Sequence, residues 1–508
     1  MRRVLLGLAV GGLVLAPAAG GTPGFRYGVA AGEMTATSAT LWARANELTR
    51  VKLYVWPTPR KGMPPVQVSL KPSNSNDRVV QRRIHGLQPG THYTYLFSTP
   101  YKRSEIAAGG TFWTAPARAA NATVRFAISG DADGARNPKT DKPAYNLFQV
   151  YGRMVAERNH FNINLGDTIY SDSEVGGVPP ALTVPAKWAK YRQNLGFGHL
   201  RNLRRGTGLY SHWDDHEFIN DFSVAEHGEP VYRAGARAFL DYNPVSFTGP
   251  TGLYRSFRWG RHLELFFLDE RSFRSAKVRS TCNGDLAPTA PQPVRDAFSA
   301  LVPALATPVP KPCLDALADP SRTMLGPRQY AAFTRAIKAS TATWKVIVNE
   351  VPIQQFFALP YDRWEGYPSE RERLLRFLQA NVKNVLFLTT DSHANFVNEV
   401  RLSTFGPGGP VGTGIWEVVT GPVATNTHNK EVDDTLGRPG MGSAIAALFY
   451  KPQPPRGVGM ACASADVYSY ASVKVTGRTL TVTPKDMSGK LVREETGGPC
   501  GPFTFRAK

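Results

Sequence analysis

The sequence predicts an α/β protein preceded by a small all-β domain. From residue 124 onward, apolar strand candidates alternate with amphipathic helix candidates, as in a sheet whose faces are covered by helices. Residues 25–115 contain short alternating strands and turns instead. At 508 residues the chain is long enough for two or more domains.

Residues 1–21, MRRVLLGLAVGGLVLAPAAGG, have the pattern of a secretory signal peptide. Arg2 and Arg3 precede an apolar run from Val4 to Leu15, and small residues follow it. The run is too short for a comfortable membrane span, and no other stretch is apolar enough for one. We therefore expect export to the periplasm, the cell surface or the medium. The paired arginines fit the twin-arginine route and the ordinary route equally.

Residues 22–117 are predicted to form a β-sandwich of the fibronectin type III or immunoglobulin kind. SATLWARA and RVKLYVWP alternate apolar and polar residues, as half-buried strands do. GLQPGTHYTYLFST has a Pro-Gly turn and then Tyr93, Tyr95 and Phe97 at period two. Because no cluster of ionisable residues occurs here, we assign this domain no chemistry.

Residues 118–508 form the predicted α/β domain. VRFAIS is a strand candidate, a helix candidate follows Pro143, and FNINLGD is the next strand, which makes a βαβ unit. Helices are expected near 326–340 and 369–381, a long loop insertion over the Pro-rich stretch 286–312, and a C-terminal hairpin in YASVKVTGRTLTVTPKD. Further strand candidates are LELFFLD, WKVIVNE, NVLFLTTD and WEVVTG.

The four cysteines, Cys282, Cys313, Cys462 and Cys500, form no CxxC pair, which argues against a zinc ribbon. An even number in an exported chain favours disulfides. Among the three possible connectivities, proximity along the chain favours Cys282–Cys313 and Cys462–Cys500. Free buried thiols are the alternative.

The net charge is +20, from 60 Lys and Arg against 40 Asp and Glu. Such a field attracts anions of any kind, including phosphate esters, nucleic acid and anionic lipid headgroups. No motif of interleaved aromatic and basic residues supports nucleic-acid binding, so we expect no stable nucleic-acid complex.

Acidic residues follow three of the predicted strands. Asp131 and Asp133 follow VRFAIS, Asp167 follows INLG, and Asp391 follows LFLTT. Carboxyl ends of parallel strands share one edge of a sheet, so these side chains can converge. Converging carboxylates repel one another unless a cation compensates them, which predicts a metal site. Carboxylates suit calcium, whereas histidine and phenolate suit iron, zinc or manganese.

Five segments together resemble the PhoD-like alkaline phosphatases and phosphodiesterases, a branch of the calcineurin-like metallophosphoesterases related to purple acid phosphatases. FRYGVAAGEMTATSATLWAR resembles the start of the family's N-terminal β-domain. NLGDTIYSDSE is similar to its Gly-Asp-x-Ile-Tyr motif, and HWDDHEFINDF to its Trp-Asp-Asp-His-Glu motif. LDERSFRS and TTDSHANFVNE resemble its Leu-Asp-x-Arg-Ser-x-Arg and Gly-Asp-x-His motifs. The resemblance implies a metallophosphoesterase β-sheet sandwich flanked by helices.

The resemblance also implies a metal centre of two or more ions, with Fe³⁺ and Ca²⁺ suspected. Asp167 would bridge two metals, with Tyr170 and His393 on a ferric ion, while His216 would lie just outside the ligands and meet the phosphate. The full set of implied ligands is Asp131, Asp167, Tyr170, Asp215, Asn349, Asp391 and His393.

Two positions depart from the family pattern. Many members end the first strand in Ser-Cys, but this chain has Ser129-Gly130-Asp131. We expect Asp131 to replace the missing cysteine ligand, which leaves the metal at that site open. The second departure is Thr390, where the family motif has glycine.

The function expected from these residues is hydrolysis of phosphate monoesters or diesters by a metal-bound hydroxide. His216 is the candidate acid for the leaving group, beside the metal ligand Asp215. Arg271 and Arg274 are candidate phosphate clamps, or else solvated surface arginines. The alternatives are a phospholipase-type phosphodiesterase and a catalytically degraded binding or adhesion protein. A monomer is expected.

Overall fold

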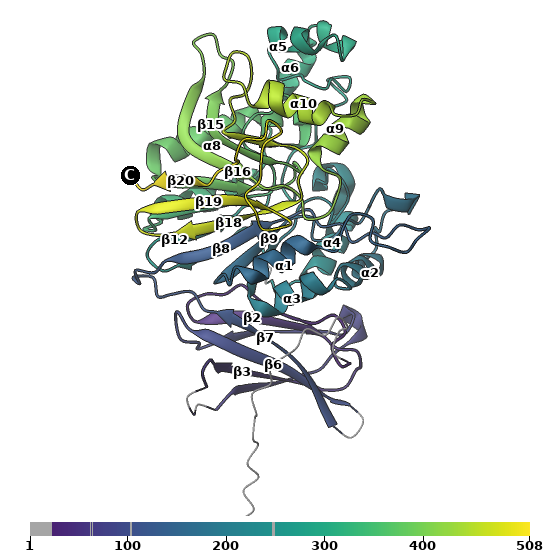
Figure 1. Cartoon of the computed structure of the whole chain (residues 1–508), viewed down its shortest axis with the longest axis vertical. Helices are drawn as coiled ribbons and strands as arrows, with labels where there is room; N and C mark the ends of the chain where they lie inside the picture. The colour runs from purple at the N-terminus through teal and green to yellow at the C-terminus, as the bar shows by residue number, and fades with distance from the viewer. Residues whose placement is uncertain (1–22, 61, 63, 102–103, 246–248) are drawn as a thin grey trace, which may run out of the picture.

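The computed structural model describes residues 23–508 apart from 61, 63, 102–103 and 246–248, so the predicted signal peptide lies outside the described residues. Two large β-sheets stack face to face with helices on their outer sides, and a smaller β layer lies at the N-terminal end of the molecule (Figure 1). This arrangement confirms the predicted fold class, an α/β sandwich with an all-β region before it.

The first large sheet has nine strands in the order β20-β19-β18-β8-β9-β10-β1-β2-β5. Its centre is parallel, because β8 pairs with β9 and β9 with β10 in the same direction. The strands are β1 Val29–Gly32, β2 Ser38–Arg44, β5 Val79–His85, β8 Val124–Ser129, β9 Phe161–Leu165, β10 Gly208–His212, β18 Ser469–Val475, β19 Thr479–Asp486 and β20 Phe503–Arg506.

The second large sheet has seven strands in the order β11-β12-β13-β14-β16-β15-β17. Its neighbours β12, β13 and β14 also run parallel to one another. The strands are β11 Arg255–Trp259, β12 Leu263–Phe267, β13 Trp344–Asn349, β14 Val385–Thr389, β15 Asn395–Ser403, β16 Val411–Val419 and β17 Cys462–Ser464.

Alternation along the strands decides what each face of a sheet covers. In β9, Phe161, Ile163 and Leu165 pack into the core between the sheets, where they meet residues of the second sheet such as Leu265 and Val348. The outer faces pack against helices, in two separate apolar clusters. The covering helices are α1 Gln149–Ala156, α2 Val184–Asn194, α3 Gly198–Gly206 and α4 Val224–Tyr242 on the first sheet, and α7 Gly326–Ala339 and α8 Pro368–Asn381 on the second.

The N-terminal region divides its strands between two sheets. A four-stranded sheet has the order β4-β3-β6-β7, while β1, β2 and β5 extend the nine-stranded sheet through pairing of Gly32 with Leu209. Gly32 permits this junction, since a Cβ there would lie 2.8 Å from the Leu209 carbonyl oxygen. The four-stranded sheet is formed by β3 Val51–Pro57, β4 Val66–Leu70, β6 His92–Tyr101 and β7 Ser104–Trp113.

Two expected elements differ from the sequence prediction. The helix expected after Pro143 begins only at Gln149, because Phe148 has a φ of +61° and is not helical. The Pro-rich stretch 286–312 is not a plain loop: it contains α5 Gln292–Phe298, the 3₁₀ helix η3 Pro303–Ala306 and the start of α6 Lys311–Ala318. Proline lies in the first turn of each, where its fixed φ favours a helix start and no N–H is needed.

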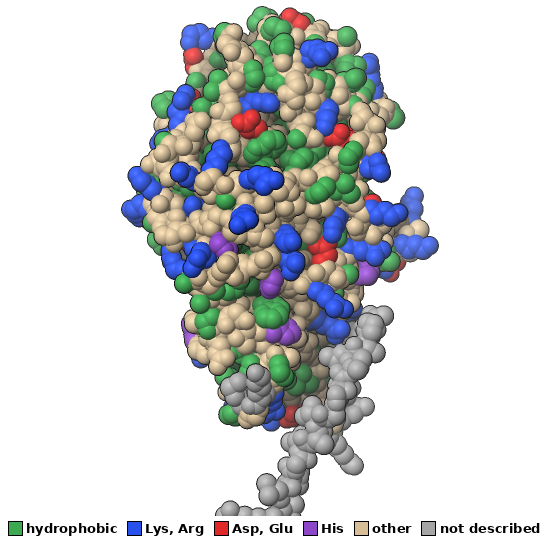
Figure 2. Space-filling view, turned by 60° about the vertical axis from the view of Figure 1, so that its left-hand side comes forward, with side chains coloured by type: hydrophobic (Ala, Val, Ile, Leu, Met, Phe, Trp, Pro, Cys, Tyr) green, Lys and Arg blue, Asp and Glu red, His purple; other side chains and the backbone are tan. Residues whose placement is uncertain are grey.

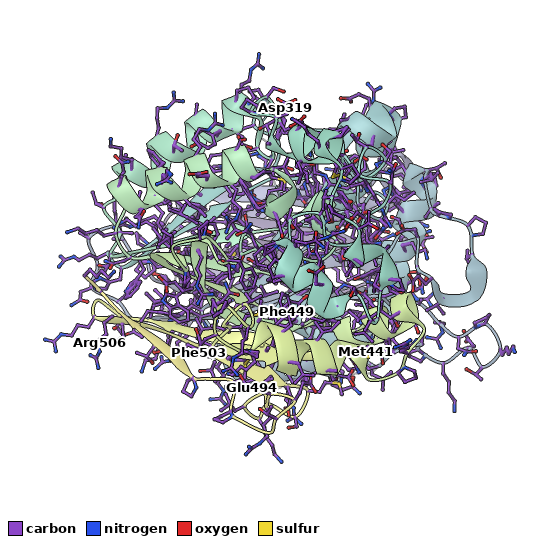
Figure 3. All side chains as sticks on the ribbon, turned by 90° about the horizontal axis from the view of Figure 1, so that it is seen from above. Asp319, Met441, Phe449, Glu494, Phe503 and Arg506 are labelled. Atoms are coloured by element: carbon purple, nitrogen blue, oxygen red, sulfur yellow. A yellow bond between two sulfur atoms is a disulfide. The ribbon has the colours of Figure 1, made fainter. Side chains whose placement is uncertain are left out.

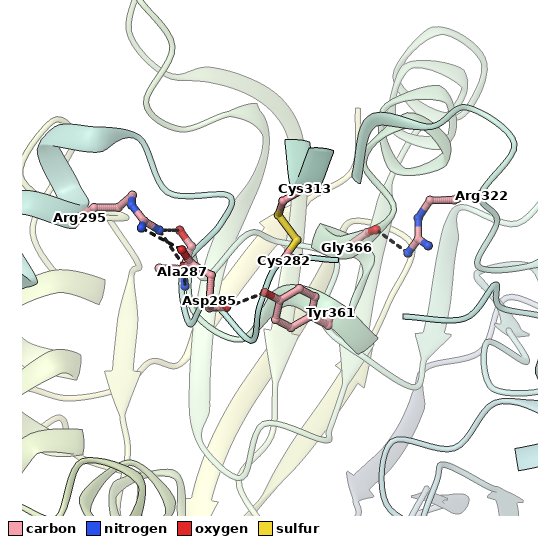
Figure 4. The surroundings of a disulfide bond; sticks show 8 residues. All are labelled: Cys282, Asp285, Ala287, Arg295, Cys313, Arg322, Tyr361 and Gly366. Atoms are coloured by element: carbon pink, nitrogen blue, oxygen red, sulfur yellow. Dashed lines mark hydrogen bonds and ion pairs between the residues drawn. A yellow bond between two sulfur atoms is a disulfide. The ribbon is translucent and has the colours of Figure 1, made fainter. Parts of the chain in front are cut away.

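Both disulfides expected from spacing are present, Cys282–Cys313 and Cys462–Cys500. Figure 4 shows the first of them beside Asp285, Arg295 and Tyr361. The predicted C-terminal hairpin is also confirmed as β18 and β19, which pair antiparallel. Among the described residues, no helix combines the length and apolar character that crossing a membrane requires.

Positive charge is spread over the surface. On the face seen in Figure 2, Lys and Arg side chains are scattered widely among few acidic ones. The excess of basic residues is therefore not confined to one patch on this face.

Candidate metal centre

Acidic residues from both sheets meet at the carboxyl ends of the parallel strands. Asp131 follows β8, Asp167 follows β9, and His393 follows β14; one ligand atom from each lies within 4.8 Å of the others. Asp167 also belongs to a second such group with Asp215 and His216. The two groups thus share Asp167, the residue that the family resemblance makes the bridge.

The backbone at this edge is held in an unusual conformation. Asp131, Asp167, Asp391 and His393 have φ values of +59°, +46°, +68° and +50°, in the left-handed region. Such residues cost on the order of 1–3 kcal/mol each and persist only where surrounding structure fixes them. Here the loops hold one another, as Ala132 N–H donates to the Asp167 carbonyl at 3.0 Å. Strain of this kind clusters at functional sites.

Asp131 has the surroundings of a metal ligand. It is fully buried, and neither carboxylate oxygen has a hydrogen-bond partner among the described residues. Burial raises the pKa of this carboxyl to about 7. An unpartnered buried carboxylate costs several kcal/mol, and a cation in contact with it would offset that cost. The residues present therefore fit a metal at this position.

Asp133, two residues on, is already bonded within the protein. Its carboxylate accepts hydrogen bonds from the Ala135 N–H at 2.8 Å and from the Ser173 hydroxyl at 2.5 Å. The two aspartates of this strand end therefore have different roles, and Asp133 shapes the loop.

Tyr170 and His393 face each other across the first group. The Tyr170 hydroxyl lies 3.1 Å from His393 Nε2, and His393 Nδ1 lies 2.7 Å from Glu431 Oε1. Glu431 belongs to helix α9, His428–Leu436. A carboxylate on one imidazole nitrogen orients the ring so that the other is available as a ligand. No sequence pattern pointed to Glu431, because its helix reaches the site only through tertiary folding.

Arg271 is a buried counter-ion to acidic residues beside the second group. Its guanidinium is inaccessible to solvent and donates to Asp391 at 2.9 Å, to Asp362 at 3.2 Å and to Asp214; Asp215 lies 3.7 Å away. Although burial opposes its charge, these carboxylates raise the pKa of Arg271 well above its usual value. Arg271 thus neutralises carboxylates of the protein itself.

Arg274 is also buried and donates to the backbone carbonyls of Asp362 and Asp221. The alternative that Arg271 and Arg274 are solvated surface residues is therefore wrong, while their role as phosphate clamps stays a prediction. They are buried because loop carboxylates and carbonyls brought together at this edge need donors, and the two guanidinium groups supply them.

His216 is held by a carboxylate that the sequence interpretation did not single out. His216 Nδ1 lies 2.6 Å from Asp172 Oδ1, and the ring stacks on Tyr170 at 4.1 Å between centroids. Burial opposes its charge, but Asp167, Asp215 and Asp172 raise the pKa of His216 well above its ordinary value. Asp172 lies five positions after Asp167 in the same motif, which was the available signal.

The remaining residues of the Asp-Asp-His-Glu run are structural. Asp214 accepts from Arg271, and Glu217 accepts from the Asp214 N–H at 2.8 Å and the Thr168 N–H at 2.5 Å. Trp213 and Phe218 are buried in the helix-side core. Glu217 therefore ties the loop after β10 to the loop after β9.

Asn349, at the end of β13, differs from the other implied ligands. Its side-chain amide donates to the Val351 carbonyl, and its oxygen accepts from Trp364 Nε1 at 3.3 Å. Both ends of the amide thus have protein partners. A third acidic group lies nearby, formed by Asp215, Asp221 and Asp362.

Lys187 of α2 supports the same loops from beneath. Its ammonium is fully buried and donates to the Ser171 hydroxyl at 2.8 Å and to the Phe218 carbonyl at 2.7 Å. Burial lowers the pKa of Lys187 from 10.5 to about 8. The buried ammonium thus joins the segment that contains Tyr170 to the one that contains His216.

The fold is shared with solved structures of phosphatases. A solved structure of PhoD superposes with a TM-score of 0.70 at 20% identity, covering 95% of this chain and 89% of that one. A purple acid phosphatase from yellow lupin (Lupinus luteus) seeds gives a TM-score of 0.56 at 11% identity, covering 92% and 73%. At these identities the similarity shows the fold.

The family models and one curated relative place the chain more narrowly. Residues 140–453 match the PhoD-like phosphatase family, and residues 12–116 match the N-terminal domain of PhoD-like phosphatases. Alkaline phosphatase D of Bacillus subtilis (strain 168) is 25% identical over 434 residues, which are 74% of this chain. The match spans 66% of that relative, just under two thirds of its length. The chain belongs to the PhoD-like phosphatase family, as its motifs indicated.

Replacing Asp131 by Asn should weaken metal binding, because it keeps the volume and removes the unpartnered charge. We expect the affinity for the metal to fall by more than the roughly 10–100-fold loss that follows mutation of a residue that only hydrogen-bonds to a metal ligand. Metal content after equilibrium dialysis against buffered iron, manganese or calcium measures this. Asp133→Asn is the matched control and should bind metal nearly as wild type does. Equal metal content in Asp131→Asn and wild type would contradict the assignment.

The buried Lys187 predicts a dependence of stability on pH. Its pKa is lower in the folded chain than in the unfolded one, so the penalty for burying the ammonium is present below pH 8. That penalty is relieved as pH rises to 10.5, by up to about 3 kcal/mol. Urea unfolding at pH 8 and 10.5 should show wild type gaining stability relative to Lys187→Met. A constant difference between the two proteins would refute this.

Proposed function

We propose that this protein is an exported, metal-dependent phosphoesterase that hydrolyses phosphate monoesters, diesters or both. The observation that carries the proposal is the pair of acid–histidine groups around Asp167, which opens into a cavity of about 520 Å³ beside His216. Membership of the PhoD-like phosphatase family supports the reaction class. A degraded binding protein is disfavoured because both groups retain their acidic residues.

The side chains divide into two proposed metal positions that share Asp167. Asp131, Tyr170 and His393 complete the first, whose phenolate and imidazole suit Fe³⁺. Asp215 and Asp391 complete the second, whose carboxylates suit Ca²⁺. Cations bound there would neutralise phosphate oxygens and lower the pKa of water.

His216 is the proposed general acid. When the bond between phosphorus and the leaving oxygen breaks, that oxygen needs a proton, and His216 Nε2 is the nitrogen not occupied by Asp172. Asp172 fixes the ring, because its other oxygen accepts the Asn220 N–H at 2.7 Å. Although burial opposes its charge, the neighbouring carboxylates raise the pKa of His216 well above its ordinary value, which favours the proton-bearing form that a general acid needs.

Charge and disulfides support the remaining parts of the proposal. The net charge of +20 attracts anionic esters toward the molecule. Two disulfides are typical of chains that fold outside the reducing cytosol. They support export, while the choice between export routes and the monomeric state stay predictions.

Removing metal should abolish hydrolysis of an aryl phosphate. Purified protein is dialysed against chelator, its metal content is checked, and p-nitrophenyl phosphate turnover is followed before and after metal is restored. We expect turnover to fall at least about a hundredfold, which is the lower end of what a single general acid or base contributes. Turnover should return when metal is restored. Undiminished turnover in metal-free protein would overturn the proposal.

Replacing His216 by Asn should slow esters with poor leaving groups most. An alkoxide needs a proton in the transition state far more than p-nitrophenolate does, so we expect kcat to fall roughly 10²–10⁴-fold for an alkyl phosphate and much less for the nitrophenyl ester. Asp172→Asn removes one of the carboxylates that raise the pKa of His216, so hydrolysis of the alkyl phosphate should begin to slow at a lower pH than in wild type. An equal loss for both esters would argue against His216 as the acid.

A further inference from the structure

The cavity beside His216 has two unlike ends. At one end lie the acidic residues and histidines of the metal centre, including Asp215 and Asp391. The other end is lined by apolar side chains of the segment 286–305, among them Val294, Phe298 and Leu301. A phosphate would fit the first end through the cations proposed there, and it does not need the second.

The apolar wall is anchored firmly to the domain. The disulfide Cys282–Cys313 closes the base of the insertion. Arg295 donates to both oxygens of Asp285, at 2.8 and 2.9 Å, and to the carbonyls of Ala287 and Thr307 (Figure 4). The Tyr361 hydroxyl donates to the Asp285 carbonyl at 2.6 Å. A wall fixed in this way is preorganised, so a ligand does not have to order it.

A second segment contributes apolar side chains to the same cavity. Phe449, in the π-helical turn Ala446–Tyr450, meets Phe298 edge to face at 5.2 Å between centroids. Seen from above in Figure 3, Phe449 lies between the insertion helices and the helix that begins at Met441. Ile445 lines the same side. Apolar surface therefore continues on both sides of the cavity.

This surface is not fully covered by the protein. Val294, Phe298, Leu301 and Val302 are half-buried, and Leu359, which lines the same cavity, is 39% exposed. A contiguous apolar surface left accessible next to a reactive site is typical of a ligand-binding wall.

We propose that this wall binds an apolar chain or ring on the alcohol esterified to phosphate, so that the preferred substrates are amphiphilic phosphate esters. This inference rests on the proposed phosphoesterase function and names its substrate class. In the reaction, a water oxygen bonds to phosphorus, the bond from phosphorus to the alcohol oxygen breaks, and the alcohol oxygen takes a proton. The products are inorganic phosphate and the apolar alcohol.

A series of dissolved n-alkyl phosphates from methyl to octyl tests the wall. Each methylene buried against it should raise kcat/KM roughly fourfold until the wall is filled. Equal kcat/KM for methyl and octyl phosphate would overturn the inference while leaving the phosphoesterase proposal intact. Failure to hydrolyse any ester with metal present would instead remove the proposed function.

Two wall variants and one matched control locate the effect. Phe298→Asn and Leu301→Asn place an amide in the wall. Each should reduce the rise in kcat/KM from methyl phosphate to octyl phosphate at least tenfold, by roughly the value of the lost apolar contact. Leu314→Asn lies on α6 of the same insertion, 46% exposed and outside the cavity lining, and should keep the wild-type gain. Thermal melting confirms that each variant is folded. An unchanged gain in folded Leu301→Asn would overturn the assignment.

A parallel experiment decides whether the amphiphilic substrate is a dissolved ester or a membrane lipid. Short-chain dihexanoyl phosphatidate below its micelle concentration is compared with dioleoyl phosphatidate in phosphatidylcholine vesicles. Hydrolysis of both supports the inference with a lipid source, and hydrolysis of the dissolved ester alone supports it with a soluble source. Hydrolysis of neither, with methyl phosphate turned over, would count against an apolar subsite.

Discussion

Repulsion between buried carboxylates is the constraint on which this structure depends. Asp167, Asp214 and Asp215 are buried close together, with the partly exposed Asp391 beside them, and such an arrangement needs compensating positive charge. Arg271 supplies that charge on one side, and on the other the carboxylates raise the pKa of His216 well above its ordinary value. Neither carboxylate oxygen of Asp131 has a hydrogen-bond partner among the described residues, although His393 lies in the same group. This leaves one buried carboxylate that a bound cation would stabilise.

The two-sheet architecture explains how the chain assembles this cluster. Parallel strands β8, β9 and β10 end at the same level as β14 of the facing sheet, so loops far apart in sequence meet at one edge. The left-handed backbone at Asp131 and Asp391 turns each chain sharply after its strand. Close packing then fixes the turns: a Cβ on Gly166 would lie 2.6 Å from that of Asp214. The same glycine that permits the turn therefore positions a neighbouring loop of the centre.

Patterns in short stretches of sequence predicted the strands and motifs that depend on such patterns. The strands that end at Asp131, Asp167 and Asp391 alternate or continue as buried runs, and the motif spacing indicated their convergence. Partners that depend on tertiary packing, such as Glu431, had no sequence signal. Residue type alone did not show that Arg271 is buried among carboxylates, because burial depends on tertiary packing. Proline density suggested a loop at 286–312, yet prolines in first turns begin helices there.

The two departures from the family motifs are in contact with each other. A Cβ on Gly130 would lie 2.8 Å from Cγ2 of Thr390 and 2.2 Å from the Leu165 carbonyl oxygen, which accepts a hydrogen bond from the Thr390 hydroxyl at 3.0 Å. A cysteine at 130 would therefore collide with the side chain that replaces the family's glycine. The threonine and the glycine form one packed unit. Because the Leu165 carbonyl oxygen also occupies this corner, position 130 has no room for the family's cysteine, and Asp131 is the acidic residue that follows it.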